Sequence, residues 1–140
     1  MILKRVAALC CAFAASFAPA VWAQDWNQIA YYVAWIGPED MRNSGGARLT
    51  DFGAVLQQDR ANYHRFGIRH PQDEGDPVFG DRAQRARIPE LYRAGGRAPG
   101  FEAGVAQGRA FGVSVFVCGY GNTPSAIYLA GFGEDHSGCF

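Results

Sequence analysis

Three segments rich in apolar, aromatic and β-branched residues predict the β-strands of this chain. Residues 29–36 (IAYYVAWI) are apolar at both alternating sets of positions, so we expect this strand to be covered on both faces. Residues 110–118 and 125–132 have a similar composition and predict a hairpin. The loop between them, 119–124, is expected to lack a tight two-residue turn.

Helical spacing and capping residues predict helices in the middle of the chain. One helix is expected over 51–66, because Gly67 would supply a left-handed end. A second is expected over 81–94, where Pro89 either kinks the helix or begins a new short one. A third short helix is expected over 99–107.

Together these elements predict an α+β fold with a small antiparallel or mixed sheet. We expect the sheet to contain the strands near 29–36, 110–118 and 125–132. The two to three central helices are expected to pack on one face of this sheet.

The predicted helix 51–66 places one charged residue, Asp59, among apolar ones. On a helical wheel of about 100° per residue, Asp59 falls in the middle of an apolar stripe, and His64 falls on the side that faces water. The stripe consists of Phe52, Val55, Leu56, Tyr63 and Phe66. A carboxylate pointing into a core needs a cationic or hydrogen-bonding partner.

Three arginines are candidate partners for Asp59. Arg48 precedes the helix, Arg69 follows it, and Arg60 can reach over from the flank. With such a partner, Asp59 would be a structural tether that holds the following loop by charge-assisted hydrogen bonds. The alternative is that Asp59 is a catalytic acid in a pocket, with a shifted pKa; His64 is a separate candidate for a catalytic residue.

The loop after this helix contains residue types that suit metal ions. His70, Asp73 and Asp76 lie close together in the sequence, but their spacing matches no HExxH motif, CxxC pair or EF-hand loop. We therefore predict no metal or other cofactor. The segment is interpreted as a solvated acidic loop that is balanced by nearby arginines, Arg82, Arg85 and Arg87.

The first 23 residues have the three-part layout of a secretory signal peptide. Lys4 and Arg5 precede an apolar stretch, which ends in the cleavage-like sequence Val21-Trp22-Ala23. A membrane anchor is the alternative, but the apolar run is too short for ~30 Å of hydrocarbon. We expect export to the periplasm or out of the cell, with residues 24–140 forming one α+β domain.

Cys118 and Cys139 are the two cysteines that remain after position 23. In an oxidising compartment such a pair is expected to form a disulfide, which would close a loop of about 20 residues. Free thiols or two metal ligands are the alternatives.

The charge balance excludes some partners. After position 23 the chain carries 11 arginines, no lysine and 13 acidic residues, which gives no electrostatic basis for binding nucleic acid or anionic lipid. Aromatic residues are numerous for a domain of this size, and Tyr and Trp beside Arg are typical of contact surfaces.

The sequence therefore favours a non-catalytic binding or cell-envelope accessory module. Its partner would be another exported protein or an envelope glycan. The alternative is a small periplasmic hydrolase that depends on a metal or on His64 with an aspartate. Serine hydrolysis has less support, because no serine lies in a G-x-S-x-G turn.

Overall fold

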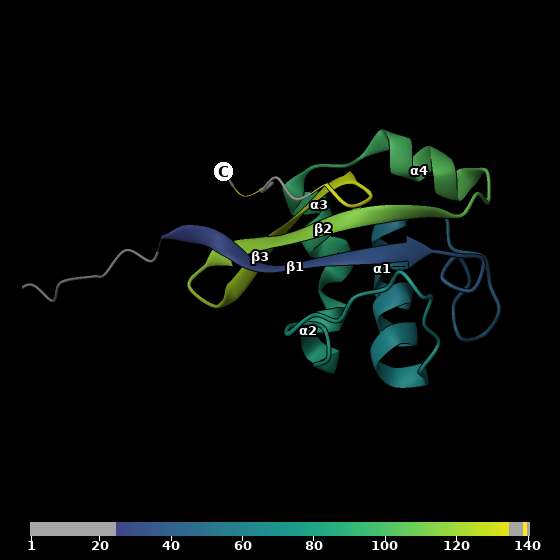
Figure 1. The fold of residues 1–140 in the computed structure, drawn as a ribbon, viewed down its shortest axis with the longest axis horizontal. Coiled ribbons are helices and arrows are strands. Elements are labelled where there is room, and N and C mark those ends of the chain that lie inside the picture. The colour runs from purple at the N-terminus through teal and green to yellow at the C-terminus, as the bar shows by residue number, and fades with distance from the viewer. Residues whose placement is uncertain (1–24, 135–138, 140) are drawn as a thin grey trace, which may run out of the picture.

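Three strands form one antiparallel sheet in the computed structural model, which describes residues 25–134 and 139 (Figure 1). The order across the sheet is β1 (Trp26–Ile36), β2 (Phe111–Tyr120) and β3 (Thr123–Gly131). With the helices described below, this confirms the predicted α+β fold. The predicted signal segment, 1–23, lies outside the described residues.

The β2–β3 hairpin has a tight turn, so the expectation of a longer loop was wrong. Tyr120 pairs with Thr123, which leaves Gly121 and Asn122 as a two-residue connection. Gly121 has a φ of 57°, a left-handed conformation that glycine adopts without strain. Such a turn matches the twist of the paired strands.

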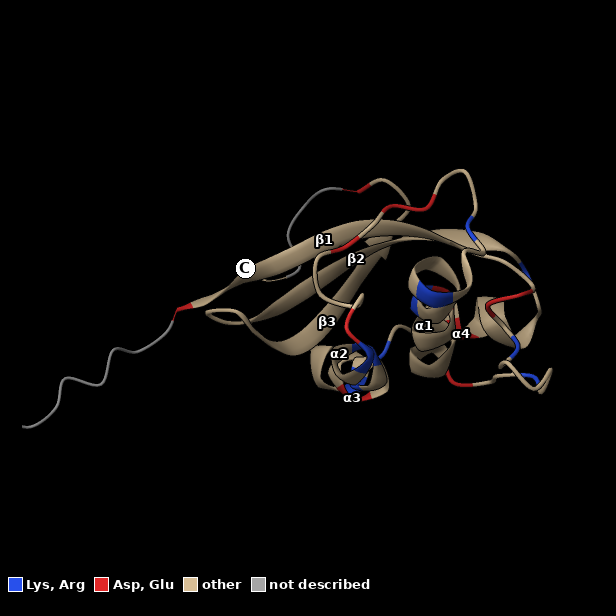
Figure 2. Cartoon of the chain, turned by 90° about the horizontal axis from the view of Figure 1, so that it is seen from below, with Lys and Arg blue, Asp and Glu red and all other residues tan. Residues whose placement is uncertain are grey.

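Five helical segments were found among the described residues, on one side of the sheet (Figure 2). They are α1 (Phe52–Ala61), the π-helix η1 (Asn62–Phe66), α2 (Arg82–Ala86), α3 (Ile88–Gly95) and α4 (Pro99–Ala106). Within the described part of the chain, no helix is long and apolar enough to span a bilayer.

The helix boundaries follow from their caps. Asp51 accepts a hydrogen bond from the N–H of Ala54 at the start of α1, and Asp81 accepts one from Gln84 at the start of α2. Pro89 lies in the first turn of α3. Backbone N–H groups in the first turn of a helix have no partner within the helix, so the missing N–H of proline costs no hydrogen bond there. The predicted segment 81–94 is thus two short helices, the second of the two alternatives.

The main core lies between the helices and the inner face of the sheet. Phe52 of α1 contacts the rings of Tyr92, Phe101 and Phe111, and so joins α1 to α3, α4 and β2. The inner positions of the strands complete this core with Tyr32, Ile36, Val113, Val115, Val117 and Ile127. This burial packs α1 against α3 and β1.

A second, smaller apolar cluster covers the outer face of the sheet. It contains Phe116, Cys118 and Ala130 together with Cys139, and Tyr31 packs against it. The expected disulfide joins Cys118 to Cys139, with their Cα atoms 5.6 Å apart. The bridge indicates an oxidising environment.

The π-helix changes the predicted orientation of residues after position 61. A π-turn is wider than an α-turn, so side chains in η1 depart from the α-helical wheel. Phe66, expected in the apolar stripe, is 43% exposed. His64, expected to face water, has a side chain that is only 17% exposed. Asp59 lies before this turn and is buried, as predicted.

Candidate functional site

The loop that follows η1 covers the free edge of β1. Its acidic side chains accept hydrogen bonds from the strand: Val33 N–H donates to Glu74 at 3.1 Å and Trp35 N–H donates to Asp73 at 2.8 Å. The N–H of Glu74 donates to the carbonyl of Val33 at 2.9 Å. Figure 2 shows this acidic loop running beside β1. These carboxylates therefore bind the edge strand, which corrects the interpretation of a solvated acidic loop.

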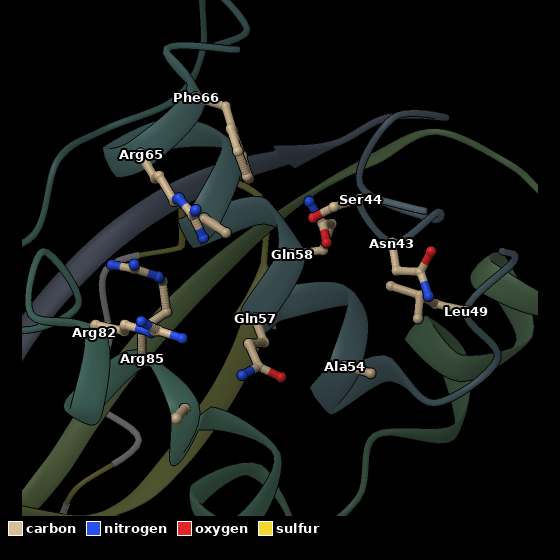
Figure 3. Close-up of a pocket in the computed structure, with 12 residues that line it drawn as sticks. Asn43, Ser44, Leu49, Ala54, Gln57, Gln58, Arg65, Phe66, Arg82 and Arg85 are labelled. Atoms are coloured by element: carbon tan, nitrogen blue, oxygen red, sulfur yellow. The ribbon is translucent and has the colours of Figure 1, made fainter. Parts of the chain in front are cut away.

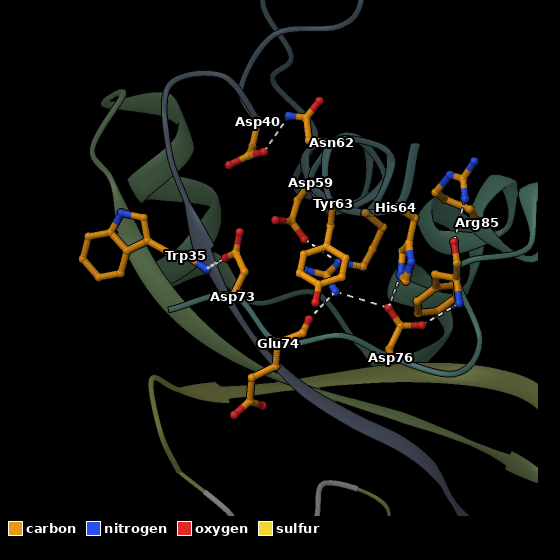
Figure 4. Close-up of polar contacts among 12 residues, drawn as sticks. Trp35, Asp40, Asp59, Asn62, Tyr63, His64, Asp73, Glu74, Asp76 and Arg85 are labelled. Atoms are coloured by element: carbon orange, nitrogen blue, oxygen red, sulfur yellow. Dashed lines mark hydrogen bonds and ion pairs between the residues drawn. The ribbon is translucent and has the colours of Figure 1, made fainter. Parts of the chain in front are cut away.

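A buried polar network, several of whose members are drawn in Figure 4, joins this loop to α1. Arg60 lies at its centre. Its side chain is fully buried; Nε donates to Asp59 at 2.7 Å, and Nη1 donates to Asp76 at 3.2 Å and to the carbonyl of Glu74 at 2.8 Å. The guanidinium also lies 4.2 Å from the ring centre of Tyr32. Burial would lower the pKa of Arg60, but the neighbouring anions outweigh it and raise the pKa. Arg60 thus stays charged.

Asp59 takes its cation from Arg60, the next residue along the chain, and not from Arg48 or Arg69. Burial raises the pKa of Asp59 to about 7 against the lowering effect of Arg60, and Asp40 and Asp73 raise it further. The carboxyl group is therefore poised between its charged and neutral forms near neutral pH.

The other two predicted partners of Asp59 hold different segments. Arg48 donates to the carbonyls of Val105 and Ala106 at the end of α4, at 3.2 and 2.8 Å, where a cation favours the helix terminus. Arg69 donates to the carbonyl of Tyr63 at 3.0 Å, with its guanidinium 4.2 Å from the Tyr63 ring centre. Asp59 is too deep in the core for either.

His64 and Asp76 form a close pair at the edge of the network. His64 Nε2 lies 2.7 Å from Asp76 Oδ2, and Asp76 Oδ1 accepts from the N–H groups of Val78 and Phe79. Burial opposes ionisation of Asp76, but the hydrogen bond from His64, these backbone bonds and Arg60 together lower its pKa. Asp76 is therefore a stable buried anion that fixes the loop before α2.

A third buried carboxyl group, Asp40, joins the turn after β1 to η1. It accepts from Asn62 and from the N–H of Gly37, each at 2.8 Å. Burial raises the pKa of Asp40, although these two hydrogen bonds lower it. His70 Nε2 lies 3.5 Å from Asp40 and 3.2 Å from Glu39.

The metal candidates do not share one site. His70 is beside Asp40, Asp73 accepts from Trp35 and from the N–H of His70, and Asp76 is beside His64. Among the described residues no group of three or more His, Cys, Asp or Glu side chains is placed to hold a metal ion.

A hollow lies between α1, η1, α2 and the turn after β1 (Figure 3). This hollow has a volume of about 390 Å³, and its lining contains no acidic residue but three arginines: Arg65, Arg82 and Arg85. Among residues 25–134 and 139, no ion pair involves any of these three. We call this feature the arginine hollow.

A neighbouring hollow of about 580 Å³ lies against the same turn. It shares Asn43, Ser44, Gln58 and Phe66 with the arginine hollow, and Ile68 lies on its far side. Phe66 and Ile68 are 43% and 45% exposed, which is unusual for large apolar side chains. We call this second feature the apolar hollow.

Sequence reasoning did not find this pair of hollows. The sequence did contain one signal for the arginine hollow: Arg82 and Arg85 are spaced to share one face of a helix. Their convergence with Arg65 needs the packing of α2 against α1, which the sequence pattern did not show.

Comparisons with known proteins give no further guide to function. No family model, curated protein or solved structure matches this chain.

Proposed function

We propose that this protein is a non-catalytic binding module of the cell envelope or the cell exterior. In this proposal one α+β domain follows a cleaved signal peptide and recognises another exported protein. The observation that carries the proposal is the arginine hollow, where three cationic side chains line a concave surface without a carboxylate partner. Unpaired arginines in a hollow are typical of recognition sites.

The buried network supports the same proposal, because its titratable groups are used within the fold. Asp59 and Asp76 both bind Arg60, while Asp73 and Glu74 bind the edge of β1. These contacts fix one wall of the arginine hollow by holding α1 and the loop before α2. We interpret the network as a scaffold that keeps a binding surface rigid.

A hydrolase is the second candidate, favoured by the 2.7 Å contact between His64 and Asp76. A histidine oriented by a carboxylate is the arrangement of a general base. However, neither residue lines either hollow, and no described serine, threonine or cysteine hydrogen-bonds to His64. The pair therefore gives weaker support for catalysis than the arginine hollow gives for binding.

The experiment compares a site variant with a control of equal charge. The tagged protein, its Arg65→Glu/Arg82→Glu variant and an Arg93→Glu/Arg109→Glu variant are each incubated with cell-envelope extract. Arg93 and Arg109 are exposed and lie outside both hollows. We expect wild type and control to retain the same partner and the site variant to lose it.

Catalysis is tested on the same preparations. The proteins are assayed on panels of ester, peptide and glycan substrates, together with His64→Ala and Asp76→Asn. Turnover by wild type that both substitutions abolish, with their folds intact, would overturn the proposal in favour of a hydrolase.

A further inference from the structure

We infer that the two hollows together bind an acidic peptide segment. A carboxylate of the peptide enters the arginine hollow, and an apolar side chain beside it lies in the apolar hollow. This inference rests on the proposed binding function and names the chemical class of the partner.

The arginine hollow is organised in advance to receive a carboxylate. Arg85 is 8% exposed, and its Nη1 donates to the carbonyls of Phe79 and Gly80 at 2.6 and 3.2 Å. These bonds fix the guanidinium plane, so little rotamer freedom remains to be lost when the arginine binds a ligand. Arg65 and Arg82 are exposed and complete the cationic lining from η1 and α2. A planar guanidinium pairs with a carboxylate through two parallel hydrogen bonds.

The lining of the arginine hollow carries positive charge and contains no acidic residue. Arg65, Arg82 and Arg85 line one hollow, and Figure 3 shows their side chains on the same side of α1. A bound carboxylate would supply the anion that this lining lacks, and excluding water from the resulting pairs would strengthen the interaction. The hollow is therefore selective for negative charge.

The apolar hollow restricts the ligand to one that also has an apolar group. Phe66 stands in the linings of both hollows, and Ile68 adds a second large apolar side chain to the apolar hollow. Glu39 and Arg42 on its border have opposite charges, so this part adds no net preference for anions. A ligand that fills both hollows needs a carboxylate and an apolar side chain as near neighbours.

A peptide meets this requirement better than a phosphate or an anionic glycan. A free phosphate would occupy the arginine hollow alone, and a uronate glycan would leave Phe66 and Ile68 uncovered. The side-chain amide of Gln57 in the lining can both donate to a C=O group and accept from an N–H group of a peptide backbone. The excess of acidic residues after position 23 also opposes long polyanions.

The first experiment selects ligands without assuming a sequence. Random seven-residue peptides are displayed either inside a loop or with a free C-terminus, and both libraries are selected on immobilised full-length protein. We expect enrichment of Asp or Glu next to Leu, Ile or Phe. Enrichment in the loop library indicates side-chain carboxylates, whereas enrichment confined to the free-end library indicates a terminal carboxylate. Neutral or basic consensus sequences, or no enrichment in either library, would overturn the inference.

The second experiment measures where the enriched peptide binds. Fluorescence anisotropy with that peptide should show at least about a tenfold loss of affinity, or about 1.4 kcal/mol, in Arg65→Glu/Arg82→Glu. A similar loss is expected for Phe66→Ser, and none for Arg93→Glu/Arg109→Glu. Equal affinity for the Asn/Gln analogue of the peptide, or displacement by millimolar inorganic phosphate or polygalacturonate as readily as by the unlabelled peptide, would overturn the inference.

The outcome separates this inference from the proposed function. If no acidic peptide is selected but the envelope partner is still lost in Arg65→Glu/Arg82→Glu, the binding function stands and the peptide class is wrong. If neither peptide nor partner depends on these arginines, both are wrong.

Discussion

His64 Nε2 lies 2.7 Å from Oδ2 of Asp76, and the same oxygen lies 3.2 Å from Nη1 of Arg60. One buried carboxylate therefore joins two residues of the helical segment to the loop that precedes α2. Through the other bonds of Arg60, this junction extends to Asp59 and to the acidic loop on β1. The helix, the loop and the sheet edge should respond to mutation as one unit.

Loss of the shared cation is expected to destabilise the fold strongly. Arg60→Met would leave Asp59 and Asp76 buried without their cation, and breaking such a network costs about 3–5 kcal/mol. Urea denaturation followed by tryptophan fluorescence measures the loss. Arg93→Met, at an exposed position in α3, is the control and should change stability by less than about 0.5 kcal/mol. A loss below about 1 kcal/mol in Arg60→Met would contradict the central role of Arg60.

Stability is also expected to depend on pH through Asp59. Burial raises the pKa of Asp59 to about 7, so between pH ~4 and ~7 the folded state keeps a proton that the unfolded state has released. The free energy of unfolding should therefore fall as pH rises through this window, by roughly 2–4 kcal/mol. Asp59→Asn should reduce this slope; Asp40, whose pKa is also raised, accounts for the remainder.

Asp76 provides a control, because its pKa is shifted in the opposite direction and its contribution to stability has the opposite pH dependence. Its pKa is lowered in the fold, so its contribution is complete above pH ~4 and is lost as pH falls below that value. Asp76→Asn should weaken the protein at neutral pH and keep the slope that arises from Asp59. Urea titrations at pH 3, 5 and 7.5 distinguish the two variants. If the wild-type protein has the same free energy of unfolding at pH 5 and pH 7.5, the pKa of Asp59 is not raised in the fold.

Sequence patterns predicted the elements that depend on local chemistry. The strands, the helix caps and the burial of Asp59 all followed from residue type and period. The positions of His64 and Phe66 did not, because the wheel assumed an α-helix through 66 and η1 is a π-helix. The two-residue hairpin turn was missed although Gly121-Asn122 is among the dipeptides that form such turns.

Long-range partners were the harder part of the candidate site. Asp59 was predicted to need a cation, but three arginines were possible and only the packed core selects Arg60. The acidic loop was interpreted as solvated because no local sequence pattern reveals that Asp73 and Glu74 lie beside β1. Asp73 and Glu74 lie 38 and 41 positions along the chain from their partners in β1. Contacts over such separations depend on how whole elements pack together, which residue spacing does not reveal.

The acidic loop is expected to protect the edge of β1. Asp73→Ala removes the acceptor for the N–H groups of Trp35 and His70, so the amide of Trp35 should exchange with solvent at least about tenfold faster, as for a lost hydrogen bond of about 1.4 kcal/mol. Hydrogen exchange read by NMR measures this, with Glu90→Ala in α3 as the control. Size-exclusion chromatography of Asp73→Ala should also show association, because an uncovered strand edge pairs with other edges. Unchanged exchange at Trp35 would mean that the loop does not guard the strand.

The last prediction separates the scaffold from the binding surface. His64→Ala removes the 2.7 Å contact to Asp76 and should lower stability by about 1–3 kcal/mol, as for a hydrogen bond to a buried charged group. It should leave binding of the envelope partner unchanged at temperatures where the variant is folded, because His64 lines neither hollow. Arg65→Glu/Arg82→Glu should behave oppositely, with normal thermal unfolding and lost binding. Thermal denaturation and partner capture on one preparation of each protein provide both measurements. If His64→Ala instead kept its melting temperature and lost binding, the histidine would belong to the functional surface and the network could no longer be regarded as scaffold alone.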